Sequence, residues 1–179
     1  MMRKRVAIIG AGFSGVAVAA HLAARAESPD VTLIEREKTF ARGLAYGTSD
    51  DQHVLNVRAA RMSAFAHAPD HFAHWLKRET GAAPTTFASR KRYGAYIEGV
   101  LHAAQRRLRG GFKRVRGEAV ACVRIGDGWR VTLANGETFD ADAVVLATGH
   151  YPPAPLPVFA RAGVPMLSAW DTHALKRLP

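Results

Sequence analysis

Residues 6–15 read VAIIGAGFSG, a short apolar run that leads into a glycine-rich turn. The apolar run predicts a buried strand of a parallel sheet, and we expect a helix to follow over residues 12–25. A second apolar run over residues 31–34 predicts a second strand that ends at Glu35. Strand, helix and strand in this order form a βαβ unit. The residues expected on the inner side of the helix are Val16, Ala19, Ala20 and Ala23.

The turn has the pattern GxGxxG, and each glycine has its own physical role. Gly10 permits a tight turn, Gly12 lets the backbone approach a pyrophosphate, and Gly15 lets the helix pack closely on the strand. The N-terminus of the helix offers free N–H groups and a partial positive charge to phosphates. Glu35 lies 20 residues after Gly15, where a carboxylate accepts hydrogen bonds from a ribose diol. The pattern predicts a dinucleotide site that fits NAD or FAD; the alternative is a glycine-rich turn of an unrelated α/β protein with Glu35 as a surface charge.

The middle of the chain alternates between irregular and helical patterns. Residues 36–68 predict a long loop, a kind of segment that usually carries function. Pro69 and Asp70 are typical of a helix start, and we expect a helix over residues 71–78. A longer amphipathic helix is expected over residues 90–109. Its apolar stripe consists of Ile97, Val100, Leu101, Ala104 and Leu108.

After the second helix the period changes to that of strands. Short strands are expected over residues 115–125, 129–133 and 138–139, with glycine-containing hairpin turns between them. A further buried strand over residues 143–147 ends in the turn ATG, residues 147–149. This order resembles the far segment of the FAD domain in two-dinucleotide flavoproteins, where a β-meander replaces a crossover helix and the ATG turn passes close to the cofactor. The resemblance favours FAD over NAD, because an NAD-only domain is expected to have a crossover helix at this point.

Several longer motifs narrow the resemblance to one family. They are GLAYGT at residues 43–48, HVLNV at 53–57, RMSAF at 61–65, DHFxxWL at 70–76 and FxxRxxYGxY at 87–96. Together they resemble the FAD/NAD(P)-binding oxidoreductases often described as NAD(FAD)-dependent dehydrogenase-like proteins. The likeness covers about residues 4–150. It implies an α/β fold: a Rossmann-like FAD/NAD(P)-binding domain made of a parallel sheet with helices and a three-stranded β-meander.

The resemblance also places parts of the chain against the cofactor. It puts the loop of residues 42–46 near the pyrophosphate and flavin, Asn56 near the flavin end, and the backbone of Val120 near the adenine. The sequence departs from the family at Ser89, where proline is usual, and at Ala41, where glycine is frequent. The cofactor-binding residues that follow are Gly10, Gly12, Phe13, Ser14, Gly15, Glu35, Arg36, Arg42, Leu44, Ala45, Asn56, Val120, Thr148 and Gly149. The alternative for part of this region is a packing role in the core, for Leu44, Tyr46, Leu55, Met62 and Phe65.

The charge is strongly basic, with a net charge of +10 and a pI of about 10.5. Such a surplus could attract nucleic acid or an anionic membrane. Because no basic segment is interleaved with aromatic residues in a stacking pattern, we expect a solvated face and no nucleic-acid partner. An acidic domain elsewhere in a longer protein could also balance the charge.

Other residue types exclude several kinds of site. Cys122 is the only cysteine, so the chain has neither an internal disulfide nor a CxxC redox centre. His67, His71 and His74 have helix-like spacing, but Pro69 is expected to place His67 outside the helix, and we expect no metal site. No run of 18 apolar residues exists, so we expect no membrane span and a cytoplasmic protein.

These observations predict a FAD-binding domain over residues 1–150 and a proline-rich connector over residues 151–179, with a short helix over 168–178. The family resemblance places an NAD(P)H domain after such a connector, and the sequence contains no second glycine fingerprint. We therefore expect the FAD-binding portion of an oxidoreductase, incomplete for catalysis alone, with NAD(P)H used only in a longer parent or with a partner. We name no catalytic residue and expect self-association through an exposed apolar face. The alternatives are a non-catalytic nucleotide-binding module and a small NAD(P)-dependent dehydrogenase; the substrate is not predicted.

Overall fold

The structure is a computed structural model that describes residues 3–150, 154, 157–158 and 167. The chain divides into two compact units, Met1–Gly149 and His150–Pro179. In the second unit the described residues include a short helical segment at Pro157 and Val158. The rest of the expected connector, and the helix expected over residues 168–178, lie outside the described residues.

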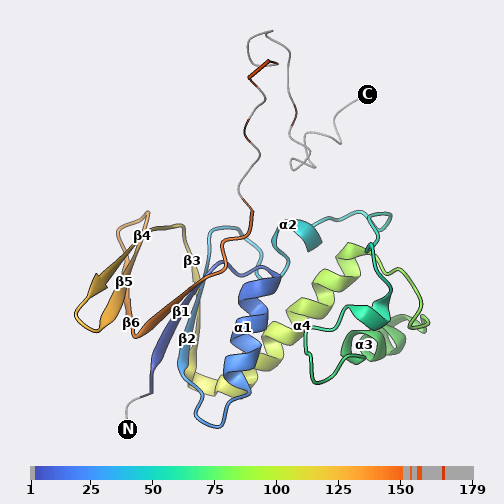
Figure 1. Cartoon of the computed structure of the whole chain (residues 1–179), viewed down its shortest axis with the longest axis horizontal. Helices are drawn as coiled ribbons and strands as arrows, with labels where there is room; N and C mark the ends of the chain where they lie inside the picture. Colours follow the sequence, from blue (N-terminus) through green and yellow to red (C-terminus); the bar gives the residue numbers. More distant parts are fainter. Residues whose placement is uncertain (1–2, 151–153, 155–156, 159–166, 168–179) are drawn as a thin grey trace. The chain divides into compact units, whose positions relative to one another are not determined.

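A four-stranded parallel sheet forms the centre of the first unit (Figure 1). Its strands are β1 (Arg5–Ile9), β2 (Asp30–Glu35), β3 (Phe112–Arg116) and β7 (Ala143–Leu146), in the order β3-β2-β1-β7. The expected βαβ unit is confirmed, because α1 (Phe13–Ala23) joins β1 to the parallel neighbour β2.

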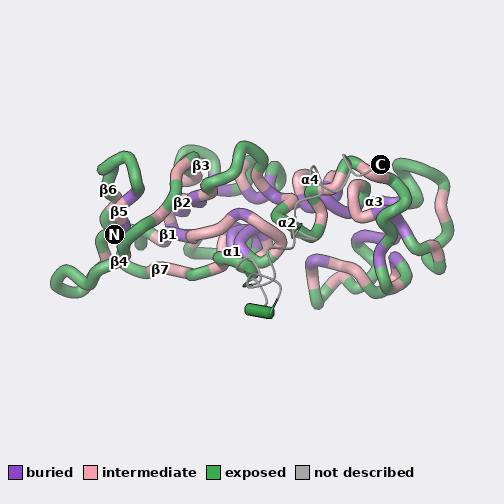
Figure 2. Tube along the Cα trace, turned by 90° about the horizontal axis from the view of Figure 1, so that it is seen from above, coloured by how far each residue is buried: buried purple, intermediate pink, exposed green. Residues whose placement is uncertain are grey.

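Two different layers cover the two faces of this sheet. On one face, Ile8 and Leu33 pack with α1 and with α4 (Arg90–Leu108) in one apolar core. On the other face, Ala7 and Ile34 pack with buried residues of a second, antiparallel sheet. The alternation of neighbouring residues between the two cores is what a strand buried on both faces requires. Figure 2 shows buried positions along both the central strands and the covering helices.

The antiparallel sheet is the expected three-stranded meander. It consists of β4 (Ala119–Ile125), β5 (Gly128–Leu133) and β6 (Thr138–Ala141), in that order. Gly126 and Gly136 occupy its two turns with φ of +56° and +85°, a conformation that glycine adopts without steric cost.

The expected inner faces of both long helices are confirmed. Val16, Ala19, Ala20 and Ala23 are buried in α1, and the whole predicted stripe of α4 is buried. The α4 core face is wider than predicted, because it also includes Tyr93, Gly94 and Tyr96.

The single strand predicted over residues 115–125 is wrong. The chain forms β3 in the parallel sheet and then β4 in the meander, with the break at Gly117. The Gly117 N–H donates to the carbonyl of Glu35 (2.9 Å), and a Cβ on Gly117 would lie 2.6 Å from Cδ1 of Leu133. The strand-like period continues through the break, so periodicity alone could not reveal that the chain changes sheets.

The region predicted as one loop, residues 36–68, contains two short helical turns. They are α2 (Gly43–Tyr46) and the 3-10 turn η1 (Ala59–Arg61). Helix α3 (His71–Thr80) follows close to its expected place, and the 3-10 turn η2 (Arg109–Gly111) ends α4. Within the described part of the chain, no helix is both long and apolar enough to cross a membrane.

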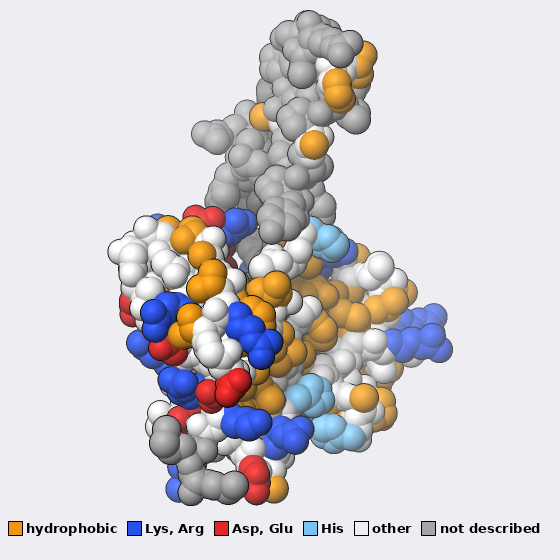
Figure 3. Space-filling view, turned by 60° about the vertical axis from the view of Figure 1, so that its left-hand side comes forward, with side chains coloured by type: hydrophobic (Ala, Val, Ile, Leu, Met, Phe, Trp, Pro, Cys, Tyr) orange, Lys and Arg blue, Asp and Glu red, His pale blue; other side chains and the backbone are white. Residues whose placement is uncertain are grey.

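One edge of the parallel sheet is formed by β7, which pairs with β1 only among the described strands. Leu146, the last residue of β7, has 70% of its surface exposed. Figure 3 shows hydrophobic side chains gathered in a broad patch on the face that it draws. The first unit therefore presents apolar surface to solvent.

Candidate functional site

The glycine turn lies at the carboxyl end of β1. Gly10 has φ of +99°, and a Cβ on it would collide with the carbonyl oxygen of Ala147 at the end of β7. The Gly10 N–H donates to the Ile34 carbonyl (2.9 Å), and the Ala147 N–H donates to the Ile9 carbonyl (2.8 Å). The turn is thus fixed to the ends of both neighbouring strands, β2 and β7. Thr148 and Gly149 follow β7 and therefore leave the sheet at the same carboxyl end as the glycine turn.

The other two glycines serve the start of α1. A Cβ on Gly15 would overlap the carbonyl oxygen of Gly10, so only glycine lets the helix approach the strand this closely. A Cβ on Gly12 would have the Cα of Gly43, 3.6 Å away, as its nearest contact, which is an ordinary distance. Gly12 is therefore dispensable for packing, and its lack of a side chain leaves the space beside the helix end open.

The N-terminus of α1 is suited to an anion. Gly12 is its N-cap residue, no side chain caps this end, and the first turn contains no acidic residue. The first N–H groups of a helix have no partner within the helix, and they lie at the positive end of its dipole. These backbone groups, which belong to the segment of Phe13, Ser14 and Gly15, can donate hydrogen bonds to phosphate oxygens.

Glu35 is held beside the glycine turn at the end of β2. Its carboxylate accepts hydrogen bonds from the backbone N–H of Ala11 (2.8 Å) and of Glu37 (3.1 Å). The side chain is therefore oriented before any ligand binds, and its remaining lone pairs can accept from a diol. Arg36 is exposed and forms an ion pair with Glu37 (3.5 Å).

Helix α2 meets the glycine turn from the other side. Gly43 has φ of +54°, and a Cβ on it would lie 3.2 Å from the Cα of Gly12. Before it, Ala41 is fully buried with φ of +77°, and its N–H donates to the carbonyl of Ala11 (2.7 Å). A left-handed conformation favours glycine, so the geometry suits the glycine that the family resemblance leads us to expect at this position.

An ion pair fixes α2 to α4. The Arg42 guanidinium donates to both carboxylate oxygens of Glu98, at 2.7 and 3.0 Å. The hydrogen bonds to Glu98 raise the pKa of Arg42, so the guanidinium stays charged. Gly94 makes the approach of the two helices possible, because a Cβ there would lie 2.6 Å from the carbonyl oxygen of Tyr46. Sequence reasoning did not select Gly94, although the motif Tyr93-Gly94-x-Tyr96 contains it.

The residues for which a packing role was the alternative fall into two groups. Leu55 is fully buried, and Tyr46, Met62 and Phe65 are partly buried against the core. Leu44 differs, because 53% of its surface is exposed on α2. Core packing therefore accounts for four of the five residues and leaves Leu44, with its exposed neighbour Ala45, available for contact with a ligand.

A cluster of aromatic rings packs between α2, the start of α1 and α4. The ring of Phe13 lies 6.5 Å from that of Tyr46 and 6.2 Å from that of Tyr93, and the two tyrosine rings are 4.6 Å apart. Burial raises the pKa of Tyr46 and of Tyr93, so both hydroxyl groups stay neutral. Phe13 thus connects the glycine turn to α2 and α4 through packing.

Two predicted residues lie apart from this cluster. Asn56 is exposed in a segment whose neighbour Leu55 donates to the carbonyl of Ala88 (2.8 Å). Val120 is 59% exposed on β4, three residues after the point where Gly117 contacts the end of β2. Among the contacts of the described residues, none links Asn56 or Val120 directly to the glycine turn.

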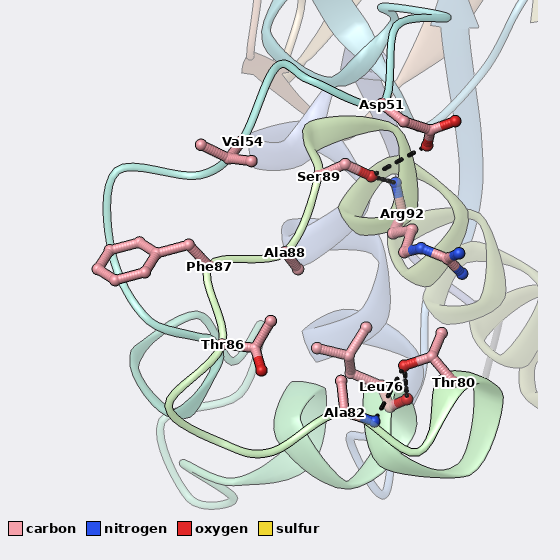
Figure 4. Close-up of a pocket in the computed structure, with 10 residues that line it drawn as sticks. All are labelled: Asp51, Val54, Leu76, Thr80, Ala82, Thr86, Phe87, Ala88, Ser89 and Arg92. Atoms are coloured by element: carbon pink, nitrogen blue, oxygen red, sulfur yellow. Dashed lines mark hydrogen bonds between the residues drawn. The ribbon is translucent and has the colours of Figure 1, made fainter.

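A separate pocket of about 340 Å³ lies between α3 and the start of α4 (Figure 4). Ser89 lines it and caps α4, since its hydroxyl accepts a hydrogen bond from the Arg92 N–H (3.3 Å). Ser89 also contacts Asp51 (3.4 Å), and the hydrogen bond from Lys91 lowers the pKa of Asp51. Phe87 projects outward with 49% of its surface exposed. None of the predicted cofactor-binding residues lines this pocket.

His71, the first residue of α3, contacts the hydroxyl of Tyr96 and the ring of Phe65. His71 Nδ1 lies 2.8 Å from the hydroxyl of Tyr96, which accepts a hydrogen bond from the Ala64 N–H (3.1 Å). The rings of Phe65 and His71 are 4.9 Å apart. Among the described residues, no group of three or more His, Cys, Asp or Glu side chains could hold a metal ion.

Comparison with solved structures finds the same fold in flavoproteins. A cyclohexanone monooxygenase from Rhodococcus sp. Phi1 bound to NADP+ is 20% identical, with a TM-score of 0.57 over 86% of this chain and 28% of that chain. A flavin monooxygenase from Stenotrophomonas maltophilia is 20% identical, with a TM-score of 0.60 over 87% and 42%. OTEMO in complex with FAD and NADP is 17% identical, with a TM-score of 0.58 over 87% and 28%. The chain thus spans less than half the length of these proteins.

Comparison with curated protein sequences finds no match. A family model described as FAD-NAD(P)-binding matches residues 7–151, which include the glycine turn, both long helices, the ATG turn and both sheets except for the first two residues of β1. Because the match covers most of the sequence, the chain belongs to this FAD-NAD(P)-binding family.

Proposed function

We propose that the chain binds FAD as the FAD-binding portion of a flavin-dependent oxidoreductase. The pyrophosphate would lie against the N-terminus of α1, the ribose diol at Glu35 and the adenine near Val120. The flavin would extend past Leu44 and Ala45 toward Asn56. A bound flavin supplies the capacity to accept and pass on a hydride equivalent, and the protein's task is to hold and orient it.

The observation that carries the proposal is the opposition of Gly12 and Gly43. Two backbone segments approach each other here with no side chain on either, and a Cβ on Gly12 would meet no obstacle from the protein itself. A glycine that packing does not require is best explained by a ligand that passes close to the backbone. The uncapped start of α1 beside it offers the donors that a pyrophosphate needs.

Two further observations support FAD as the dinucleotide. The N–H of Ala11 fixes the Glu35 carboxylate beside the glycine turn (2.8 Å), where it would accept hydrogen bonds from a ribose diol. The meander β4-β5-β6 stands where an NAD-only domain would place a crossover helix. Arg42 would contribute positive charge near the pyrophosphate while Glu98 holds its guanidinium in place.

The parent enzyme would transfer hydride from NAD(P)H to the flavin. We propose that the chain alone lacks the site for that reductant, which a longer protein or a partner would supply, and that residues 1–150 and 151–179 are the cofactor domain and its connector. The proposal identifies no catalytic residue in this chain and no substrate.

An absorbance spectrum tests the proposal. We expect the protein to keep the two visible flavin bands after addition of FAD and removal of the excess, and to keep them when NADH is added. Bleaching by NADH would show that the chain, alone or as an oligomer, completes a reductant site. Absence of retained flavin would contradict FAD binding, and a parallel titration with NADH would then test the small-dehydrogenase alternative.

A pair of alanine variants tests where the cofactor lies. Gly12→Ala introduces a methyl group that the protein tolerates at an ordinary distance, yet places it in the proposed path of the pyrophosphate. Gly99→Ala, on α4, meets no atom within 4 Å and is the control. We expect Gly99→Ala to keep or raise the thermal stability. Gly12→Ala should still fold but lose up to about 1 kcal/mol, because alanine is a poorer N-cap residue than glycine. Only Gly12→Ala should lose flavin. If Gly12→Ala retained flavin fully, the proposed position of the pyrophosphate beside Gly12 would be wrong.

A further inference from the structure

A second hollow lies at the opposite end of the parallel sheet from the glycine turn. It has a volume of about 950 Å³ and lies where β1 begins, near the N-terminus in Figure 1, and where α1 and α4 end. Its apolar surface comes from Val6, Leu22, Pro29 and Leu108. Val6 and Leu22 are half-buried and supply the accessible part of this apolar floor, whereas Pro29 and Leu108 are buried.

The rim of the hollow is basic. Five cationic side chains line it, namely Arg3, Lys4, Arg25, Arg107 and Arg109. Glu27 is an acidic residue on the same rim, and Asp30 forms an ion pair with Arg3 at 3.7 Å. Like charges gathered around an apolar surface repel one another, and an anion bound among them would relieve that repulsion.

One of these arginines has an unfavourable backbone. Arg109 has φ of +50°, in a region that glycine adopts readily and that L side chains rarely adopt. Two glycines, Gly110 and Gly111, follow directly, yet the left-handed position is occupied by arginine. Strained residues of this kind are enriched at ligand sites, where the strain holds a side chain in place.

The ordinary explanation for cations here is that they complement the C-terminal ends of the two helices. That explanation is weak for α1. The Ser28 hydroxyl already donates to the Ala23 carbonyl (3.4 Å) and the Arg25 carbonyl (2.8 Å) at this end. It also leaves the apolar floor and the strained Arg109 unexplained.

We propose that this hollow, which we name the basal pocket, binds an amphipathic anion. The ligand would have a planar or aliphatic apolar body against the floor and a phosphate, sulfonate or carboxylate group among the arginines. Val6 lies in β1 and Gly10 directly follows this strand, four residues or about 13 Å further along the chain. The basal pocket is therefore distinct from the glycine turn, and both can be occupied together.

The probe is 8-anilinonaphthalene-1-sulfonate, titrated into the 15N-labelled protein with and without FAD. We expect one saturable site whose amide shifts cluster at residues 3–6, 22–29 and 107–109. Uncharged N-phenyl-1-naphthylamine should bind far more weakly, and raising the salt concentration should weaken sulfonate binding. Shifts that cluster instead at the glycine turn or along β7 would overturn the proposal.

Matched variants separate a specific site from general charge. The double variant Arg25→Gln with Arg107→Gln should bind the sulfonate more weakly, with a dissociation constant about fivefold to tenfold higher. The control is Lys77→Gln with Arg78→Gln, which removes the same charge from the last turn of α3 and should leave the dissociation constant within about twofold. Equal affinities in the two double variants would overturn the proposal.

A third variant tests the strained residue. Arg109→Gly removes both the charge and the unfavourable φ, so we expect higher thermal stability together with weaker sulfonate binding. A purely structural arginine would change the stability alone, and unchanged affinity would overturn the role assigned to Arg109. Because FAD is not needed for any of these measurements, failure here leaves the proposed flavin site untouched, and the reverse also holds.

Discussion

Replacing Gly94 with alanine tests how α4 positions the candidate cofactor site. Helix interiors favour alanine over glycine by about 1 kcal/mol, so the substitution alone should stabilise α4. The new methyl carbon, however, would lie 2.6 Å from the carbonyl oxygen of Tyr46 and 3.3 Å from Cγ and Nη1 of Arg42. The Arg42 side chain can adjust, whereas the carbonyl belongs to the backbone of α2.

The opposing effect can be estimated from these distances. Restoring a normal carbon–oxygen separation requires α2 and α4 to move apart by roughly 0.5–1 Å. Overpacking of this size costs about 1–3 kcal/mol, which matches or exceeds the gain in helix propensity. Gly99→Ala in the same helix meets no atom within 4 Å and should keep the full gain. We therefore expect Gly94→Ala to be less stable than Gly99→Ala by about 1–3 kcal/mol.

Two assays measure this difference. In thermal unfolding, 1 kcal/mol corresponds to about 2–4 °C for a chain of this size, so the two variants should differ by several degrees. In FAD titration, displacement of α2 should weaken binding by Gly94→Ala on the order of tenfold, with Gly99→Ala unchanged. Equal stability of the two variants would refute the packing argument, and a destabilised Gly94→Ala with normal FAD affinity would separate α2 from the cofactor site.

Three other predictions concern the described residues. Burial, and then nearby positive charge, lowers the pKa of His71 below its ordinary 6.5, so the unfolded chain binds more protons and stability should fall as the pH drops below about 6.5. Urea midpoints at pH 7.5 and 5.5 should show a smaller loss for His71→Asn than for wild type, and an equal loss in the two proteins would contradict this prediction. Ala41→Val should destabilise the protein by about 1–3 kcal/mol, because a β-branched residue tolerates the φ of +77° poorly, and Ala41→Gly should stay within about 1 kcal/mol of wild type in the same assay. Light scattering should show dimers or larger species, since β7 forms a sheet edge with Leu146 70% exposed, and a monodisperse monomer would contradict this expectation.

Much of the architecture could be predicted because local and global signals agree. The apolar run before Gly10, the glycine spacing and the second run ending at Glu35 each favour the same βαβ unit, and packing did not override any of them. The same holds for the apolar stripe of α4. The strand β3 was missed for the opposite reason. Its residues and those of β4 read as one continuous strand, and only the contact of Gly117 with the end of β2 separates them.

The candidate site depends on the backbone more than on side chains, and this limits what sequence alone can show. Gly10, Gly12 and Gly15 form a recognisable pattern because they lie within six residues of one another. Gly43 and Gly94 also allow backbone segments to approach closely at this site, but they come from distant parts of the chain. Their roles depend on atoms of other segments, the Cα of Gly12 for one and the Tyr46 carbonyl for the other. A glycine whose partner is far away in sequence has no local signature, so the two glycines that place α2 could be identified only once the helices were seen together.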